Sequence, residues 1–187
     1  PNIMASLHIA LIHYPVLNKA AEQICSSLTN LDIHDIARLS LFYGVTNYWI
    51  VHPQPEQQKL LSTILDFWNN SKDLPYNPSR SEALGLIKHT RNFDSLIDDI
   101  TTQEATRPTI ISTTARTMPK QISFNKLKTL HQSPRPLLLV FGTAYGLDDE
   151  IHSRADHILA PLTGAGDYNH LSVRSAVAVI LDRITSG

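Results

Sequence analysis

The chain has 187 residues, of which 42% are hydrophobic, and a formal net charge of −1 at pH 7. This length and composition allow one substantial buried core, and we expect a single domain spanning residues 4–187. The near-zero net charge argues against a protein that coats nucleic acid without specificity, so any contact with nucleic acid would need a local basic patch.

Cysteine content and hydropathy indicate the compartment. Cys25 is the single cysteine, so no internal disulfide can form and a reducing compartment is the simpler expectation. No apolar stretch approaches the roughly 20 residues that a membrane-spanning helix needs. We therefore expect a cytoplasmic protein with no membrane partner.

The beginning of the chain predicts a strand, a helix and a second strand. Residues 7–12 form a short aliphatic run that Pro15 stops, which is typical of a buried strand. Apolar residues at helical spacing follow over residues 33–41, and Gly44 stands where a helix commonly ends. The β-rich run at residues 47–51 is the next expected strand. Short connections of this kind favour parallel pairing.

The middle of the chain continues the alternation. An amphipathic helix is expected over residues 56–68, and the polar, proline-containing residues 69–80 are expected to form a loop. A short strand at residues 84–88 and a helix at residues 93–100 come next, before a β-branched strand at residues 109–113.

The last part of the chain completes the pattern. The remaining expected elements are an amphipathic segment at 124–130, an apolar strand at 137–141, a short helix at 148–155, a strand at 157–159 and a helix at 171–184, with Asn169 or His170 near its cap. Strands that alternate with helices in this way predict an α/β fold with a mainly parallel sheet flanked by helices.

Glycines gather in this last part. Four of the seven glycines fall between Gly142 and Gly166, in two loops that each leave the end of a buried strand. Glycine lets the backbone adopt positive φ or approach a ligand closely. Because open α/β sheets bind small molecules at the carboxyl ends of their strands, the two loops predict a small-molecule site.

The sequence lacks the motifs for nucleotide-phosphate binding, metal binding and serine hydrolysis. The segment Gly142–Gly146 matches neither a G-x-G-x-x-G fingerprint nor a Walker loop. The histidines show no metal-ligand spacing, so we expect no metal, and we expect His152 and His157 to be surface or strand residues. Ser172 lacks a G-x-S-x-G elbow and stands where a helix cap is ordinary, which makes a hydrolase a weak hypothesis.

Several sequence blocks occur together in the order of a known family. They are Asn30–Arg38, Tyr43–Val45, Ser112–Arg116, Phe141–Leu147 and Tyr168–Ala176. Together they resemble the SPOUT class of S-adenosylmethionine-dependent RNA methyltransferases, with partial similarity to tRNA guanine-N1 methyltransferases. The resemblance covers nearly the whole chain.

The resemblance implies a deep trefoil knot in the C-terminal part, with S-adenosylmethionine held among three loops at residues 112–116, 141–146 and 159–173. Glycine loops can offer backbone N–H and C=O groups to an adenine ring, which agrees with a small-molecule site. The resemblance assigns the following residues to the cofactor: Ser112, Thr113, Thr114, Phe141, Gly142, Tyr145, Gly146, Leu159, Leu162, Gly164, Gly166, Tyr168, His170, Leu171, Ser172 and Val173. Leu159, Leu162 and Leu171 are equally well explained as core residues.

For catalysis the resemblance points to Arg38, Arg116 and Asp167. An arginine can bind the target phosphate or lower the pKa of the group to be methylated, and a solvated or salt-bridged arginine is the alternative at both positions. Asp167 is the candidate general base if the acceptor is a ring nitrogen, although a turn also favours Asp. His170 is a candidate base or helix cap, and Arg174 suits RNA binding or a dimer interface.

The resemblance predicts transfer of a methyl group to tRNA or rRNA. We expect the domain itself to recognise the RNA, most simply as a homodimer that joins two surfaces. The densest basic segment comprises Lys120, Lys126, Lys128 and Arg135, and it is a candidate RNA contact or a solvated face. The alternatives are a non-catalytic RNA-binding or assembly protein with the same fold, and an unknotted nucleotide-binding α/β protein. The RNA, the nucleotide and the acceptor atom, a base nitrogen or a ribose 2′-oxygen, stay open.

Overall fold

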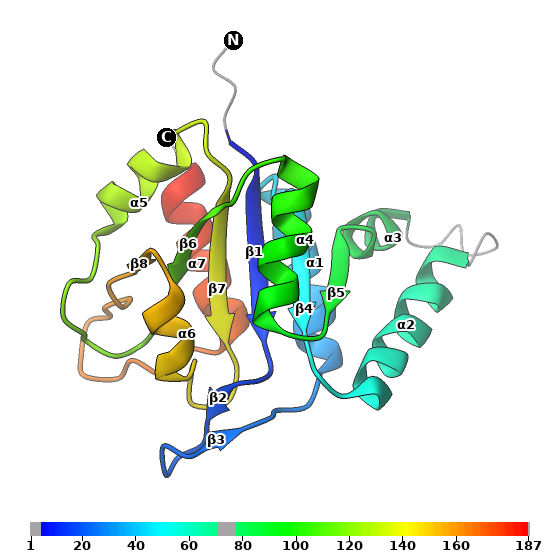
Figure 1. Cartoon of the computed structure of the whole chain (residues 1–187), viewed down its shortest axis with the longest axis horizontal. Helices are drawn as coiled ribbons and strands as arrows, with labels where there is room; N and C mark the ends of the chain where they lie inside the picture. The colour runs from blue at the N-terminus through cyan, green and yellow to red at the C-terminus, as the bar shows by residue number, and fades with distance from the viewer. Residues whose placement is uncertain (1–4, 71–77, 187) are drawn as a thin grey trace.

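The computed structural model describes residues 5–70 and 78–186, which alternate between strands and helices (Figure 1). The strands are β1 (Leu7–Ile12), β2 (Val16–Leu17), β3 (Gln23–Ile24), β4 (Asn47–Val51), β5 (Ile87–Thr90), β6 (Thr109–Ser112), β7 (Leu137–Gly142) and β8 (His157–Ile158). The helices are α1 (Asn30–Phe42), α2 (Pro55–Asn70), α3 (Pro78–Leu84), α4 (Phe93–Glu104), α5 (Phe124–His131), α6 (Asp149–Arg154) and α7 (Val173–Thr185).

One six-stranded sheet carries the fold, in the order β5-β4-β1-β7-β6-β8. All neighbouring pairs are parallel, so the six strands end at the same edge. β1 and β7 lie at the centre, where residues 7–12 and 137–141 are buried. Strands that are covered on both faces read as continuous apolar runs, which made these two recognisable in the sequence. The expected α/β class with a mainly parallel sheet flanked by helices is confirmed.

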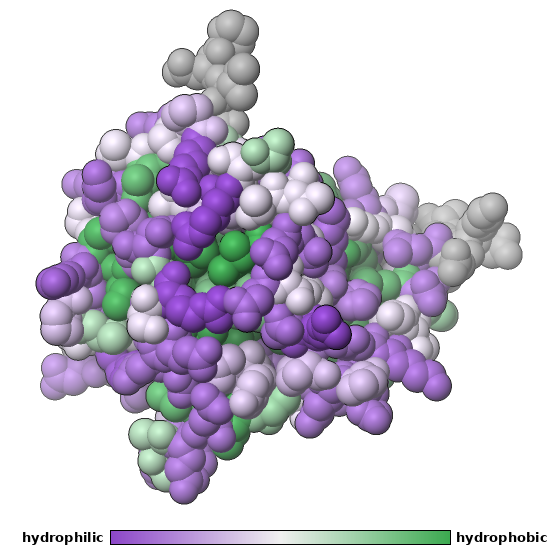
Figure 2. Space-filling view, viewed as in Figure 1, coloured by the Kyte–Doolittle hydropathy of each residue, from purple (hydrophilic) through white to green (hydrophobic). Residues whose placement is uncertain are grey.

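Helices cover both faces of the sheet. In Figure 1, α4 and α6 lie in front of the strands and α1 and α7 lie behind them. The core divides accordingly, because Ile36 and Leu181 of α1 and α7 pack in one cluster, whereas Leu96 and Ile151 of α4 and α6 pack in another. The outer surface of the front face is largely hydrophilic, with hydrophobic side chains visible between the polar ones (Figure 2).

Backbone caps set the ends of the helices that flank the site. Gly44, with φ of +70°, follows α1 at the position predicted from the sequence. Ser172, rather than Asn169 or His170, caps α7, because its Oγ accepts a hydrogen bond of 3.2 Å from the Ser175 N–H. The expected capping role of Ser172 is confirmed, and Asn169 and His170 lie two or three residues before the cap.

Two features of the structure were not predicted. β2 and β3 form an antiparallel hairpin between β1 and α1, and strands of two residues carry no periodic signal. Of the loop predicted at residues 69–80, the first two residues belong to α2 and the last three to α3, while residues 71–77 lie outside the described part. Pro78 opens α3, where its missing N–H costs no helical hydrogen bond. Because α3 extends to Leu84, the following strand starts at Ile87 rather than at residue 84.

Candidate functional site

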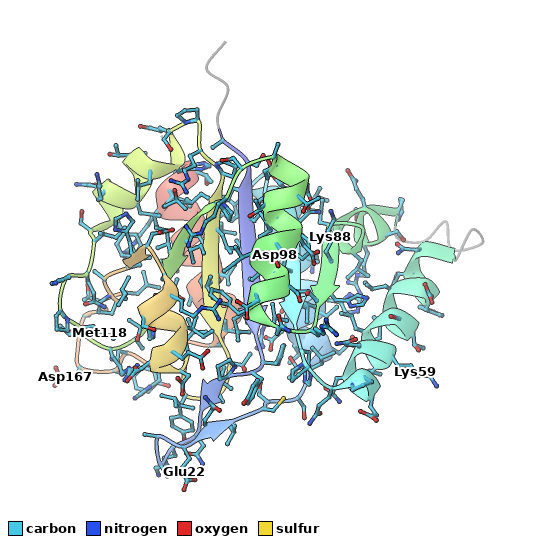
Figure 3. The ribbon with its side chains drawn as sticks, in the orientation of Figure 1. Glu22, Lys59, Lys88, Asp98, Met118 and Asp167 are labelled. Carbon is cyan, nitrogen blue, oxygen red and sulfur yellow. The ribbon has the colours of Figure 1, made fainter. Side chains whose placement is uncertain are left out.

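The carboxyl ends of β7, β6 and β8 are neighbours at one edge of the sheet. The segments that follow β6, β7 and β8 are residues 113–123, 143–148 and 159–172, here named the first, second and third loop. Met118 of the first loop and Asp167 of the third lie at the same side of the molecule in Figure 3. The parallel sheet thus brings together three loops that overlap residues 112–116, 141–146 and 159–173, the segments that the resemblance assigned to the cofactor.

Hydrogen bonds join the first loop to the third. The side-chain amide of Asn169 donates to the Ala115 carbonyl at 2.9 Å. The Gln121 Nε2 donates to the Leu159 carbonyl at 3.2 Å. The Ile122 N–H donates to the Ile158 carbonyl at 2.8 Å, and the Ile122 carbonyl accepts from the Ala160 N–H at 2.9 Å. The third loop is therefore attached to the first loop near both of its ends.

The second loop is a tight turn after β7. A Cβ on Gly142 would lie 2.6 Å from the backbone nitrogen of Leu147 and 2.9 Å from the carbonyl carbon of Gly146, so only glycine fits. Gly146 adopts φ of +109°, which side-chain-bearing residues rarely adopt. The Tyr145 N–H donates to the Leu17 carbonyl at 3.0 Å. The turn leaves the Tyr145 side chain 62% exposed.

The third loop is irregular, and residues 163–172 are all exposed. Tyr168 and Leu171 are 76% and 51% exposed, so neither large side chain packs into the core. A Cβ on Gly166 would meet no atom within 4 Å, and one on Gly164 would meet none closer than 3.8 Å. The loop therefore combines exposed apolar side chains with open space beside its backbone.

The three leucines assigned to the cofactor differ in their surroundings. Leu159 is 1% exposed and belongs to the core. Leu162 is half-buried against the same core cluster. Leu171 stands outside it, which makes Leu171 the member of the three whose apolar surface is accessible.

The side chains that follow β6 are engaged within the protein. The Oγ of Ser112, which is fully buried, lies 2.8 Å from Nδ1 of His152. The hydroxyl of Thr113 donates to the Val140 carbonyl at 2.9 Å, and that of Thr114 accepts a backbone N–H two residues along the chain. The prediction of His152 as a surface or strand residue was wrong, because it lies on the inner side of α6 and is 4% exposed.

The candidate catalytic residues lie at two places. Arg116, Asp167 and His170 are exposed on the first and third loops. The guanidinium of Arg116 forms an ion pair with Asp149 at 2.7 Å, so the salt-bridged alternative describes this arginine. Arg38 is exposed on α1, on the face of the sheet opposite α6.

Two grooves meet at Arg38. The first, here named the α7 groove, lies between α1, α3 and α7, has a volume of about 760 Å³ and reaches Ser172 and Arg174. The second, named the Trp68 groove, lies between α1, α2 and α3, has a volume of about 560 Å³ and is lined in part by His34 and Trp68. Arg38 therefore lines both grooves, and the α7 groove also reaches Ser172 at the end of the third loop.

Arg174 ties α7 to α1. Its guanidinium lies 2.8 Å from a carboxylate oxygen of Asp32 and 3.4 Å from one of Asp35. The Thr29 hydroxyl donates to the other Asp32 oxygen at 2.7 Å. This partly buried network fixes the start of α7, and thus the end of the third loop, against the helix that carries Arg38.

A polar cluster that the sequence did not single out lies at the carboxyl ends of β1, β4 and β7. Nδ1 of His13 is 3.0 Å from Oγ of Ser26, which hydrogen-bonds in turn to the Thr143 hydroxyl. Nε2 of His52 is 2.9 Å from the Ser26 carbonyl. The sequence contained one indication of this cluster. His13 and His52 each directly follow a predicted strand, and the carboxyl ends of parallel strands are where ligand-binding groups commonly lie.

Burial makes His13 neutral at physiological pH. The side chain is 1% exposed, and its Nε2 has no hydrogen-bond partner. Desolvation, followed by the charge of His52, lowers the pKa of His13 from 6.5 to about 4, against the opposing effect of Asp32.

Neither a metal site nor a membrane span was found in the described residues. Among residues 5–70 and 78–186, no group of three or more His, Cys, Asp or Glu side chains is placed to hold a metal ion. No helix within the same ranges is long and apolar enough to cross a membrane.

Comparison with known proteins places the chain in a family. Residues 6–186 match the family model of SAM-dependent RNA methyltransferases. The chain belongs to this family. An uncharacterised protein of Aquifex aeolicus is 38% identical over 185 residues, which cover 98% of this chain and 90% of that protein. A tRNA (guanine-N(1)-)-methyltransferase of Oleidesulfovibrio alaskensis is 41% identical over 179 residues, which cover 96% of this chain and 42% of that protein.

The fold of this RNA methyltransferase family member is also similar to a solved structure. The SpoU methyltransferase AviRb of Streptomyces viridochromogenes, in complex with the cofactor AdoMet, matches with a TM-score of 0.61 at 14% identity, over 97% of this chain and 60% of that chain. The predicted resemblance to SPOUT methyltransferases is confirmed, and the non-catalytic alternative is not favoured. The chain spans less than half the length of the Oleidesulfovibrio methyltransferase that it matches.

The neutral His13 predicts a loss of stability in acid. The pKa of His13 is about 4 in the folded state and near 6.5 in the unfolded state. Between these two pH values the unfolded state therefore binds more protons than the folded state. The stabilisation is complete above pH 6.5 and is lost as the pH falls towards 4. At pH 5 the His13 contribution to the free energy of unfolding should be about 2 kcal/mol smaller than at pH 7.

Urea unfolding at pH 7 and pH 5 measures this effect. A His13→Asn variant should lose less stability between the two pH values than the wild type does. His89→Asn, at an exposed position of β5, is the matched control and should behave like the wild type. Equal pH dependence in the wild type and in His13→Asn would contradict the assignment.

Proposed function

We propose that the three loops bind S-adenosylmethionine and that the chain transfers its methyl group to tRNA or rRNA. The observation that carries the proposal is the convergence of the loops at one sheet edge, with Asn169 hydrogen-bonded to Ala115 across two of them. The proposed cofactor residues are those that the sequence predicted within 112–116, 141–146 and 159–173. The proposed methyltransferase domain spans residues 4–187.

The loops fit such a ligand. An adenine ring requires an apolar slot with backbone donors and acceptors at its edge. Tyr145, Tyr168 and Leu171 offer exposed apolar surface, and the space beside Gly164 and Gly166 lets a ligand approach the backbone. When bound, S-adenosylmethionine supplies an electrophilic methyl group.

Arg38 and Asp167 are proposed to act on the RNA. Among the described residues, Arg38 makes no ion pair, so its guanidinium is available to bind a phosphate through two hydrogen bonds. Asp167 is proposed to accept the proton that a ring nitrogen releases as its bond to the methyl carbon forms, with His170 as the second candidate base. Arg116, paired with Asp149, is proposed to contact the RNA from the first loop.

We further propose that the C-terminal part forms a deep trefoil knot. The support is that the third loop is bonded to the first near both of its ends, while α7, which follows the third loop, packs against α1 and α5. An experimental chain trace in which residues 159–172 do not pass through the loop after β6 would contradict this proposal.

A homodimer is proposed to form over the α7 groove. Phe42 is 79% exposed at the end of α1, and the adjoining groove wall includes Leu39, Ala83 and Ala178. A second copy that covered this apolar surface would remove it from water and would stand beside Arg38.

Loss of Arg38 should impair methyl transfer without impairing cofactor binding. Arg38→Ala should lower the rate of transfer to total tRNA or ribosomal RNA by about 100-fold or more, since a charge-assisted contact to the RNA is removed. Calorimetry with S-adenosylhomocysteine should give wild-type affinity. Radiolabelled methyl incorporation measures the rate.

Arg183→Ala is the matched control, because Arg183 lies in the last turn of α7 with its guanidinium over the Phe124 ring, and it lines neither of the grooves at Arg38. It should keep wild-type transfer. Absence of S-adenosylhomocysteine binding to the wild type would overturn the cofactor site, whereas full activity of Arg38→Ala would overturn only the role of the arginine.

A charge on the proposed dimer surface should separate the subunits. Phe42→Glu should sediment as a monomer at concentrations where the wild type sediments as a dimer, because it places a carboxylate against an apolar surface. Leu60→Glu changes a leucine that is 45% exposed on α2 and should remain dimeric. A monomeric wild type in sedimentation velocity would contradict the proposal.

A further inference from the structure

The Trp68 groove has an aromatic and cationic wall that the proposed function does not use. Trp68, which is half-buried on α2, is part of this wall. The guanidinium of Arg80 lies 5.3 Å from the Trp68 ring centroid. The His34 ring meets the Trp68 ring edge-on, with 5.6 Å between the ring centroids. The ring of Phe67, which is 61% exposed, also meets the Trp68 ring edge-on at 5.6 Å. Such walls are where proteins stack unpaired bases.

Two buried polar atoms of this wall have no hydrogen-bond partner. They are Nε of Arg80 and Nδ1 of His34. The Arg80 Nε–H is a donor that costs free energy while it is unpaired, so a ligand acceptor that reached it on binding would strengthen binding. The carbonyl oxygens and ring nitrogens of nucleobases are acceptors of this kind.

The charge of the groove favours an anion. Arg38 and Arg80 line it together with one carboxylate, that of Asp35. Asp35 is itself 3.4 Å from Arg174, so its charge is partly neutralised within the protein. Two arginines beside an aromatic ring can hold a phosphate while the base stacks.

We propose that the Trp68 groove binds an unpaired nucleotide of the RNA, with its base on Trp68 and its phosphate between Arg38 and Arg80. This inference rests on the proposed function and specifies how the protein would select its RNA substrate. Because Arg38 also lines the groove that reaches Ser172 at the end of the third loop, the bound nucleotide is a near neighbour of the one to be methylated. The enzyme would then prefer RNA in which the target lies in a loop or single-stranded region.

Tryptophan fluorescence tests the stacking directly. The chain has two tryptophans, so a Trp49→Phe background leaves Trp68 as the single reporter. A single-stranded oligoribonucleotide of mixed sequence should quench this fluorescence, and the same strand in a blunt duplex should quench it much less. An unchanged Trp68 signal on addition of RNA that demonstrably binds would overturn the proposal.

Substitution of the ring tests its contribution to affinity. Trp68→Ala should weaken binding of the oligoribonucleotide by about 10-fold, whereas Trp68→Phe, which keeps a stacking surface, should lose much less. Leu60→Ala on the same helix is the matched control and should bind as the wild type does. Wild-type RNA affinity in Trp68→Ala would overturn the proposal.

Cofactor binding separates this proposal from the one on which it rests. All of these variants should bind S-adenosylhomocysteine with wild-type affinity, which also shows that they are folded. Cofactor binding and methyl transfer to RNA in the wild type, together with wild-type RNA affinity in Trp68→Ala, would overturn the groove proposal alone. Loss of cofactor binding in the wild type would instead overturn the proposed function.

Discussion

The parallel pairing of β1 with β7 is the constraint on which the rest of the structure depends. Its register runs from Leu7 opposite Leu137 to Ile12 opposite Gly142, and it joins the first strand of the chain to a strand in its last third. Burial of each aliphatic side chain in such strands stabilises the fold by roughly 1.5–3 kcal/mol, so a shift of register would be strongly disfavoured. Because the paired strands end together, the turn at Gly142 is held beside the loop that follows β1.

The geometry on the far side of the sheet follows from the same pairing. β1 leads into α1 and β7 into the segment that ends at α7, and Arg174 joins these two helices through Asp32 and Asp35. Arg38 is thereby held within one groove wall with Ser172, at the end of the loop proposed for the cofactor. The residue proposed for the RNA and the loop proposed for the methyl donor thus come from opposite halves of the chain, and an ion-pair network positions them.

Local patterns in the sequence predicted most of the sheet, because continuous apolar runs such as residues 137–141 have one simple structural explanation. They also predicted the glycine loops, since Gly142 stands where a Cβ would clash with the backbone and Gly146 adopts a positive φ. They failed where tertiary contact decides the outcome: His152 is buried because Ser112 offers it a partner, and the His13 cluster joins residues from three separate strand ends. The Trp68 groove depends on α3, whose first three residues lay within the predicted loop.

Hydrogen–deuterium exchange with and without S-adenosylhomocysteine tests the central claim most directly, because it reads each backbone segment in the intact protein. A ligand held among three loops at one sheet edge should slow exchange in residues 112–116, 141–146 and 159–173 together, and leave the carboxyl ends of β4 and β5 unchanged. Protection confined to the β4 and β5 ends, or to one of the three loops alone, would contradict the account.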